Sequence, residues 1–534
     1  MSSHAVPADP VLSCRDLTVR IGGTPVVEAV SLDLRRGWIT GILGESGSGK
    51  SQLVRALTGL SSGRVEGRVL FDGQDLVAAP PHSLRAIRGR RIAYVFQNPM
   101  SALNPYFRIE MQLAEVAEIH LGLSRAQARA RALEMLRRVR LPEPARRLRA
   151  FPHELSGGQR QRVVIAMALM ADPVLLIADE PTTALDVTVQ RRILDLVRSL
   201  CTDQALSCIF ITHDIAVASH IADETLVMHR GRVVEQGPTT RLVSAPRDPY
   251  TQALIRDTPT LSGPVPPQAA LGAPLLQVSD LGVRYMTGSL LRRGAGFQAV
   301  EGVSFSVAAG ETLGIVGESG SGKSTIARAL VRLAPVTAGE ILWRGAPVTR
   351  LDEGAFRPVR REIQTVFQDP FASLNPRMRL ANLVAEPLRI HNPDISEAVI
   401  RDRVTAAIES VGLEPAMASR FPHELSGGQA QRIAIARAIV SEPAMLICDE
   451  AVSALDVTVQ ARVLSLIGTL QERLSLAILF ISHDLAVVRQ VADRILVLEA
   501  GRVCELADRD RIFARPEHPY TRRLLDSVLT VEAG

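Results

Sequence analysis

The sequence predicts an α/β fold in which two similar domains follow one another, each built on a mainly parallel sheet. Three observations support this prediction. The chain has 534 residues, more than a single domain usually contains. Its two halves carry the same motifs in the same order. Within each half, short apolar runs rich in β-branched residues alternate with longer stretches of helical spacing, a pattern typical of parallel sheets.

The repeat is a duplicated domain. The segment Gly-Glu-Ser-Gly-Ser-Gly-Lys-Ser occurs at 44–51 and 317–324, and Phe-Pro-His-Glu-Leu-Ser-Gly-Gly-Gln occurs at 151–159 and 421–429. Positions 50 and 323 are 273 apart and positions 156 and 426 are 270 apart, so the halves are colinear. A solenoid would repeat at a much shorter period.

A proline-rich stretch separates the halves, and this composition is expected of an extended, semi-rigid connector. Its prolines are Pro259, Pro264, Pro266, Pro267 and Pro274. The sequence therefore predicts a first domain at 10–258, a linker at 259–275 and a second domain at 276–534.

The apolar pattern predicts individual elements. We expect a strand over 313–316, before a glycine-rich turn, and a helix over 324–331, after it. Residues 174–178 and 444–448 are continuous apolar runs that lead into acidic residues, as expected of buried central strands with functional carboxyl ends. The regions from about 100 to 170 and from about 371 to 440 are rich in Ala, Arg and Leu at helical spacing. They predict a helical subdomain in each half.

The composition narrows the class of protein. Hydrophobic residues make up 46% and charged residues 22%, which excludes a mainly disordered chain. The start lacks the regions of a signal peptide and every apolar run is too short for a membrane span, so we expect a cytoplasmic protein. The cysteines lack the spacing of a disulfide framework or a zinc site. They are Cys14, Cys201, Cys208, Cys448 and Cys504.

The basic residues carry a more specific signal. A formal charge of +5 is compatible with nucleic acid or an anionic membrane, but 56 scattered acids favour an ordinary mixed surface. Of 61 basic residues, only Lys50 and Lys323 are lysine. This usage suggests that a compact ammonium on a flexible stem is needed at these two places.

Both lysines lie in segments that fit the phosphate-loop pattern Gly-x-x-x-x-Gly-Lys-Ser. In such a loop, backbone N–H groups surround the phosphates, the lysine reaches the β and γ phosphates, and the serine hydroxyl binds Mg²⁺. A plain Gly/Ser-rich turn is the alternative, but two copies between a strand and a helix favour a nucleotide. The predicted nucleotide-binding residues here are Gly44, Glu45, Ser46, Gly47, Ser48, Gly49, Lys50, Ser51, Gln52, Gly317, Glu318, Ser319, Gly320, Ser321, Gly322, Lys323, Ser324 and Thr325.

Two pairs of acids supply the carboxylates that phosphoryl transfer to water requires. They are Asp179 with Glu180 and Asp449 with Glu450, each pair at the end of an apolar run. The aspartate would hold the Mg²⁺ water shell, and the glutamate would orient and polarise the attacking water. Acids at strand ends also occur as mere turn formers, but their spacing from a phosphate loop favours catalysis.

A third repeated motif, Leu-Ser-Gly-Gly-Gln, can aim backbone amides, a hydroxyl and a helix N-terminus at an anion. A simple helix cap would explain one copy, but not two in the same order with the other motifs. The motif resembles the signature sequence of ABC ATPases, and the resemblance spans nearly the whole chain. Its predicted nucleotide-binding residues are Ser156, Gly157, Gly158, Gln159, Ser426, Gly427, Gly428 and Gln429.

The resemblance implies further parts of the site. Each domain would add an antiparallel β subdomain to its parallel core and helical subdomain. Gln97 and Gln368 resemble the glutamine that touches metal and nucleotide, and His213 and His483 resemble the histidine that grips the γ phosphate. The cofactors implied are ATP and Mg²⁺. The residues expected to hold the metal are Ser51, Gln97, Asp179, Ser324, Gln368 and Asp449.

In this family the domains face each other head to tail, with each nucleotide between one phosphate loop and the other domain's signature. The resemblance therefore pairs Lys50 and Glu180 with Ser426 and Gly428. The second site would combine Lys323, Glu450, Ser156 and Gly158. The segments 182–186 and 452–456 resemble the loop that crosses this interface.

One departure concerns the aromatic residue that stacks on adenine in this family. Alignment of the halves gives Tyr285 in the second half but Ile21 in the first. We expect the first site to hold adenine less tightly.

Repeated elements near the end of each half indicate what the ATPase drives. Pro-Tyr-Thr occurs at 249–251 and 519–521, and the segments 98–105 and 369–376 follow the two glutamines. Together they resemble the dipeptide, oligopeptide and nickel importer ATPases of bacteria. This implies an ATPase on the cytoplasmic face of the inner membrane that works with two permease subunits and a separate binding protein. Peptides or related small solutes are the expected cargo.

Two alternatives stay open at this point. A soluble tandem ABC ATPase acting on ribosomes or DNA would also have two domains, but such proteins usually carry a long charged linker or zinc-binding cysteine pairs. An exporter ATPase is disfavoured by the paired C-terminal elements. We expect no nucleic-acid partner, and no iron–sulfur cluster because neither half has the cysteine cluster of some importer ATPases.

Overall fold

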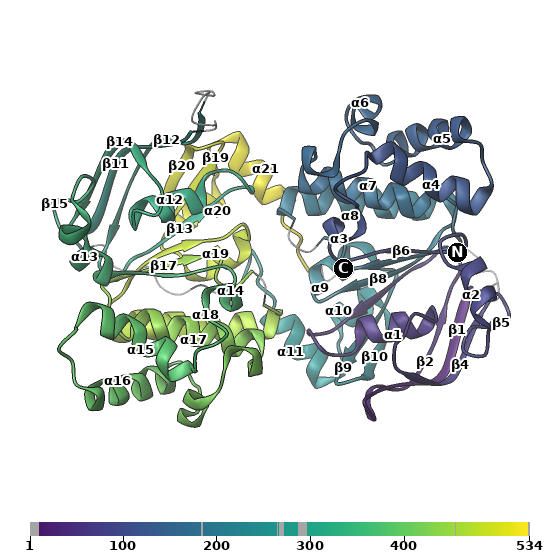
Figure 1. Cartoon of the computed structure of the whole chain (residues 1–534), viewed down its shortest axis with the longest axis horizontal. Coiled ribbons are helices and arrows are strands. Elements are labelled where there is room, and N and C mark those ends of the chain that lie inside the picture. The colour runs from purple at the N-terminus through teal and green to yellow at the C-terminus, as the bar shows by residue number, and fades with distance from the viewer. Residues whose placement is uncertain are drawn as a thin grey trace. The chain divides into compact units, whose positions relative to one another are not determined.

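The computed structural model describes residues 10–182, 185–263, 265, 272–286, 296–453 and 455–531 (Figure 1). Contacts divide the chain into two units, one made mostly of residues up to Thr258 and the other mostly of residues from Pro259 to Val528. Each unit contains a largely parallel sheet, an antiparallel sheet and a group of helices, which confirms the predicted fold class. The domain limits stay a prediction, and linker residues 264 and 266–271 lie outside the described part.

A six-stranded sheet forms the centre of the first unit, in the order β10-β9-β3-β8-β7-β6. All neighbours are parallel except β10, which runs antiparallel to β9. Its strands are β3 (Ile39–Leu43), β6 (Ile92–Val95), β7 (Leu175–Asp179), β8 (Ser207–Thr212), β9 (Glu224–His229) and β10 (Arg232–Pro238). An antiparallel sheet lies beside it in the order β2-β1-β4-β5. Its strands are β1 (Leu12–Ile21), β2 (Thr24–Leu34), β4 (Arg64–Phe71) and β5 (Gln74–Asp75).

The helices of the first unit include the predicted helical subdomain, which spans α3 to α7. The helices are α1 (Lys50–Leu57), α2 (Pro81–Ile87), α3 (Pro99–Ala102), α4 (Ile109–Leu121), α5 (Arg125–Arg138), α6 (Pro144–Leu148), α7 (Gly157–Leu169), α8 (Val187–Gln204), α9 (Ile215–Ile221), α10 (Thr239–Ser244) and α11 (Pro249–Asp257), with a short 3-10 turn, η1, at Pro152–Glu154.

Strand β7 shows why the central strands are apolar throughout. Leu175 and Ile177 pack into the core shared with the antiparallel sheet, whereas Leu176 and Ala178 pack into the core shared with the helical subdomain. Successive side chains of a strand point to opposite faces, so a strand covered on both faces needs apolar residues at every position.

The second unit repeats this arrangement. Its parallel sheet has the order β16-β17-β18-β13-β19-β20 and its antiparallel sheet the order β12-β11-β14-β15. The strands are β11 (Pro274–Tyr285), β12 (Phe297–Ala308), β13 (Thr312–Val316), β14 (Val336–Trp343), β15 (Ala346–Pro347), β16 (Ile363–Val366), β17 (Met445–Asp449), β18 (Ala477–Ile481), β19 (Arg494–Glu499) and β20 (Arg502–Asp508). The helices are α12 (Lys323–Leu330), α13 (Glu353–Glu362), α14 (Pro370–Ser373), α15 (Leu380–His391), α16 (Glu397–Ser410), η2 (Pro415–Ser419), η3 (Pro422–Glu424), α17 (Gly427–Ile439), α18 (Val457–Leu474), α19 (Leu485–Val491), α20 (Arg509–Ala514) and α21 (Pro519–Ser527).

The predicted elements agree with those observed to within a residue or so at each end. The strand expected at 313–316 is β13, the helix expected at 324–331 is α12, and the runs at 174–178 and 444–448 are β7 and β17. In Figure 1, α15, α16 and α17 of the second helical subdomain lie together on one side of β17. Among the described residues, every helix is either too short or too polar to cross a membrane.

Candidate functional site

Each phosphate loop joins a central strand of the parallel sheet to a helix whose first residue is the lysine. Two of its glycines are required because the backbone of the sheet leaves no room for a side chain. A Cβ on Gly44 would lie 2.3 Å from the carbonyl oxygen of Met228, and one on Gly49 would lie 2.6 Å from that of Val26. The matching distances in the second unit are 2.2 Å at Gly317 and 2.6 Å at Gly322.

The lysine of each loop folds back over the loop. Lys50 Nζ donates to the carbonyl oxygens of Gly44 at 2.7 Å and Glu45 at 2.8 Å. Lys323 Nζ makes the same two bonds at 2.6 and 2.9 Å. Burial lowers the pKa of Lys323, an effect that nearby carboxylates, Glu450 foremost, oppose. A nucleotide phosphate would supply the charge that this buried ammonium needs.

Two serine hydroxyls make the loops a good fit for phosphate. The Oγ atoms of Ser48 and Ser321 are buried within the loops and have no hydrogen-bond partner. A buried hydroxyl without a partner is costly. Phosphate oxygens at the loop are acceptors that could satisfy such donors.

A serine and an aspartate meet next to each loop. Ser51 Oγ donates to Asp179 Oδ1 at 3.2 Å, and Ser324 Oγ donates to Asp449 Oδ1 at 2.8 Å. Burial raises the pKa of both aspartates, although the serine bonds oppose the effect. Hydroxyl and carboxylate oxygens are the ligands that Mg²⁺ prefers. Four of the predicted metal-binding residues are therefore paired as a magnesium site requires.

The predicted catalytic glutamate lies between the predicted glutamine and histidine. In the first unit, Gln97 Nε2 donates to Glu180 Oε2 at 2.9 Å, and His213 Nδ1 lies 3.3 Å from Glu180 Oε1. Both glutamines thus contact the glutamate rather than the serine–aspartate pair. The corresponding distances to Glu450 are 2.7 Å from Gln368 and 3.6 Å from His483.

The contact between Glu450 and His483 shifts the pKa of both residues. The imidazole of His483, next to the carboxylate, lowers the pKa of Glu450 against the effect of burial. Burial alone would lower the pKa of His483, but Glu450 raises it above its usual value. The backbones of Glu180 and Glu450 are also left-handed, with φ of 45° and 50°. Such conformations concentrate at functional sites, where the surrounding structure holds them in place.

The signature motifs open helices α7 and α17. Ser156 caps α7, since its Oγ accepts the N–H of Gln159 at 3.4 Å, and Ser426 caps α17 in the same way. A Cβ on Gly158 would lie 2.5 Å from Val189 Cγ1, which explains why only glycine fits there. A helix N-terminus can bind an anion, and nucleotide binding by these residues stays a prediction.

The structure gives less information on the adenine-stacking position and on the predicted interface loops. Ile21 and Tyr285 both end the first strand of an antiparallel sheet, so they occupy matching positions. Of the predicted interface loops, Thr183, Ala184 and Ala454 lie outside the described residues.

Three tyrosines near the site were missed from the sequence. Tyr94 donates from its hydroxyl to Asp179 Oδ2 at 2.9 Å, whereas the matching position of β16 is Thr365. Tyr250 and Tyr520 accept N–H groups of the phosphate loops. In the sequence, Tyr94 has no feature that separates it from other strand residues. The repeated Pro-Tyr-Thr motif marks Tyr250 and Tyr520 but does not predict which residues they contact.

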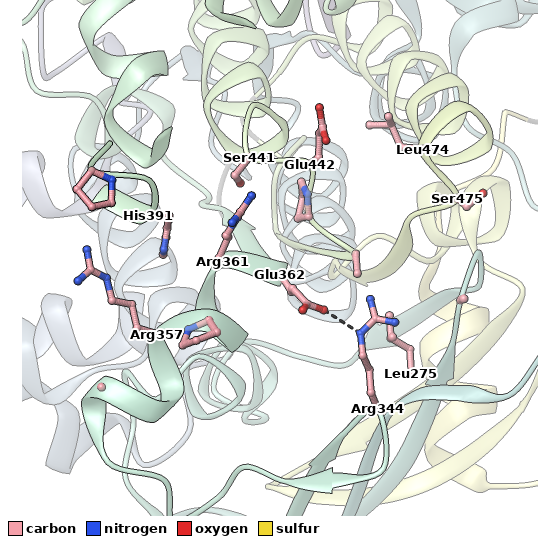
Figure 2. A pocket seen from close by; sticks show the side chains of 16 residues that line it. Leu275, Arg344, Arg357, Arg361, Glu362, His391, Ser441, Glu442, Leu474 and Ser475 are labelled. Atoms are coloured by element: carbon pink, nitrogen blue, oxygen red, sulfur yellow. Dashed lines mark hydrogen bonds and ion pairs between the residues drawn. The ribbon is translucent and has the colours of Figure 1, made fainter. Parts of the chain in front are cut away.

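A pocket of about 810 Å³ in the second unit is separate from these residues (Figure 2). Arg344 Nε donates to Glu362 at 2.9 Å across it. Glu362 and Ala444 directly precede β16 and β17, whereas Gln368 and Glu450 follow these strands. The pocket therefore lies at the amino-terminal edge of the sheet and the catalytic residues at the carboxyl-terminal edge.

Comparison with known proteins identifies the family. The family model described as ABC transporter matches residues 27–183 and 300–453. The model described as oligopeptide/dipeptide transporter, C-terminal region, matches residues 234–274 and 504–534. Both models match twice, once in each half of the chain.

Full-length relatives agree with the family models. The chain is 45% identical to peptidoglycan transport ATP-binding protein YejF of Agrobacterium fabrum, over 98% of this chain and 97% of the relative. It is 44% identical to glutathione import ATP-binding protein GsiA of Pectobacterium atrosepticum, over 98% and 90%. It is 45% identical to an uncharacterized ABC transporter ATP-binding protein YejF of Escherichia coli, over 94% and 95%. The chain therefore belongs to the ABC transporter family, as an ATP-binding protein and ATPase with two ABC domains in tandem.

Proposed function

We propose that this ATPase energises the import of peptides or related small solutes, in partnership with two permease subunits and a separate binding protein. The repeated match to an oligopeptide/dipeptide transporter C-terminal region carries the proposal. The names of the relatives, which include peptidoglycan transport and glutathione import, support cargo that contains peptide groups.

We infer an apolar surface beside the first site that suits a permease, from four exposed side chains that lie close together in the sequence. Phe96, Met100, Phe107 and Met111 are 46%, 39%, 46% and 49% exposed. Exposed apolar groups next to one another are typical of protein interfaces. Phe96 adjoins Gln97, whose side chain contacts Glu180, so a partner on this surface would sense the catalytic glutamate.

The proposed chemistry uses the geometry of each unit. Lys50 and the loop amides would bind the phosphates, while Ser51 and Asp179 would hold Mg²⁺, which would supply charge stabilisation to the transferred phosphoryl group. Glu180 orients the attacking water, and His213 and Gln97 hold that carboxylate. In the family arrangement, the signature of the opposite domain would complete each site, so that ATP would join the domains and hydrolysis would release them. The second unit uses Lys323, Ser324, Gln368, Asp449, Glu450 and His483 in the same roles.

A capture experiment tests the importer assignment. A tagged chain carrying Glu180→Gln and Glu450→Gln would bind ATP but hydrolyse it at least a hundredfold more slowly, because the catalytic carboxylates are lost. Purified from native membranes with ATP, it should retain its partners. We expect two transmembrane permeases, which hold the ATPase at the cytoplasmic face of the inner membrane. A chain with Lys50→Ala and Lys323→Ala, which cannot hold ATP, is the control.

The genes beside those permeases would identify the binding protein and hence the cargo. Recovery of ribosomes or DNA in place of permeases would overturn the proposal and favour a soluble tandem ATPase.

A further inference from the structure

The peptide group that joins the first two residues of each phosphate loop is held from both sides. In the first unit, the carbonyl oxygen of Gly44 accepts a hydrogen bond from Lys50 Nζ at 2.7 Å. The N–H of Glu45, in the same peptide group, donates to the hydroxyl of Tyr250 at 3.1 Å. Because a peptide group is planar, the tyrosine that fixes its N–H also fixes the direction of its carbonyl.

The second unit makes the same contact with its own residues. Gly317 O accepts from Lys323 Nζ at 2.6 Å, and the N–H of Glu318 donates to the hydroxyl of Tyr520 at 3.0 Å. Burial raises the pKa of Tyr520 to about 12. Two copies of one contact favour a function over incidental packing.

The loop needs a brace because its first residue is glycine. Glycine is required there, since a Cβ on Gly44 would lie 2.3 Å from Met228 O. A glycine offers little resistance to rotation of the adjacent peptide group. Rotation would point the Gly44 carbonyl away from Lys50 and break one of the two hydrogen bonds that hold the ammonium. Within the loop, Lys50 holds the carbonyl of this peptide group, and the restraint on its N–H comes from Tyr250, outside the loop.

The tyrosine is itself anchored firmly enough to act as that restraint. Asp248 Oδ1 accepts the N–H of Tyr250 at 2.8 Å, and Glu235 Oε2 accepts the N–H of Asp248 at 3.0 Å. The ring of His229 stacks on the ring of Tyr250 at 4.1 Å. These contacts tie α11 to the parallel sheet through β9 and β10.

The second tyrosine is anchored by different side chains. His518 Nδ1 accepts the N–H of Tyr520 at 3.2 Å, and Glu505 Oε2 accepts the N–H of His518 at 3.1 Å. The guanidinium of Arg523 lies 5.6 Å from the centre of the Tyr520 ring. The two units thus share the hydrogen bond between the tyrosine hydroxyl and the phosphate loop, although the residues around the tyrosine ring differ between them.

We propose that Tyr250 and Tyr520 are positioning residues for the nucleotide sites. Each hydroxyl orients the peptide group that holds the phosphate-loop lysine, and so couples the segment matched by the transporter C-terminal model to nucleotide binding. The proposal rests on ATP binding by the loops and is independent of the cargo. Failure of the permease capture would leave it intact.

Tyr250→Phe and Tyr520→Phe remove one hydroxyl each and keep the ring. Binding of ADP with a fluorescent methylanthraniloyl group is measured in a chain carrying Lys323→Ala, so that only the first loop binds. Tyr250→Phe should weaken binding there by about two- to tenfold, the usual effect of one hydrogen bond. Tyr520→Phe in the same background is the matched control and should leave binding unchanged. The Lys50→Ala background should reverse the two results.

Hydrogen–deuterium exchange of the nucleotide-free chain gives a readout that does not depend on activity. Tyr250→Phe should speed exchange in the peptide covering residues 44–50 and leave residues 317–323 unchanged. Tyr520→Phe should do the opposite. Thermal unfolding of both variants shows whether the fold is kept.

The outcomes are distinct. Weaker binding together with faster local exchange in the matching loop supports the proposal. Unchanged ADP binding, or equal losses at both loops from either variant, overturns it. If general destabilisation caused the weaker binding, exchange would be faster throughout the unit, and this result would also count against a positioning role.

Discussion

Ile21 and Tyr285 end matching strands but offer a nucleotide different surfaces. Ile21 is 40% exposed at the end of β1, and Tyr285 packs partly against the core at the end of β11. A flat aromatic ring can stack on adenine, whereas a β-branched aliphatic side chain can give only apolar contact. At the residue scale, the two sites should therefore differ in nucleotide affinity.

Ile21→Tyr should raise the affinity of the first site for ATP by about fivefold or more, because stacking of a base on an aromatic ring contributes roughly 1–3 kcal/mol. Titration of fluorescent nucleotide into a chain with Lys323→Ala measures the first site alone. Ile21→Leu is the control and should change little. Equal affinity of Ile21→Tyr and the parent chain would rule out adenine stacking at this position.

At the scale of elements, one buried carboxylate in each unit fixes the C-terminal segment to the sheet. Glu505 of β20 accepts the N–H groups of Glu517 at 3.0 Å and His518 at 3.1 Å, just before α21. Burial raises the pKa of this carboxyl, but the nearby Thr521 hydroxyl and the hydrogen bonds from these N–H groups outweigh it, so the pKa is lowered from 4.5. Glu235 does the same before α11.

Glu505→Gln should lower the free energy of unfolding by roughly 1–3 kcal/mol at pH 7, because it replaces charge-assisted hydrogen bonds with weaker ones. A carboxyl whose pKa is lowered in the folded state contributes its full stability above the unfolded value of about 4.5, and loses it as the pH falls through the folded pKa.

The loss of unfolding free energy in Glu505→Gln, relative to the parent chain, should therefore stay constant from pH 8 to pH 5 and shrink below pH 4.5. Thermal unfolding across this range measures it. Glu301→Gln removes an exposed partner of Arg502 and should cost almost nothing at any pH. A deficit that grows as the medium becomes more acidic would contradict the assignment.

At the scale of the whole molecule, the family arrangement predicts that the two domains work as a pair. A linker that joins two interacting parts raises their effective concentration to the millimolar range. Pairing within one chain should then be insensitive to dilution of the protein.

A protease site inserted between Gly263 and Gly272 allows the purified chain to be cut after folding. The intact chain should keep its ATPase rate per molecule on dilution from micromolar to nanomolar, whereas the cut chain should lose most of it. Gel filtration of the diluted sample shows whether the pieces have separated. Separated pieces that keep the full rate would show that the domains hydrolyse ATP independently.

The sequence by itself determined the two-domain organisation, the phosphate loops, the paired acids and the signature helices. These features are local. A glycine-rich turn, a helix cap and a strand buried on both faces each require particular residues at neighbouring positions of the sequence. Lys50 and Glu180 could thus be assigned from short motifs. Glu180 and the two residues that contact it, Gln97 and His213, are more than thirty positions apart in the sequence. No local pattern connects residues at such distances.

Only the tertiary structure decided how those distant residues meet. The strand order brings Gln97, Glu180 and His213 together at the carboxyl edge of β6, β7 and β8. It also places Tyr250 against Glu45, 205 positions away. The ion pair between Asp72 and Arg91 recurs in the second unit with its charges exchanged, as Arg344 and Glu362, and this correspondence also became visible only in the structure. Such contacts depend on which strands become neighbours, and that order is set by packing of the whole sheet rather than by any one segment.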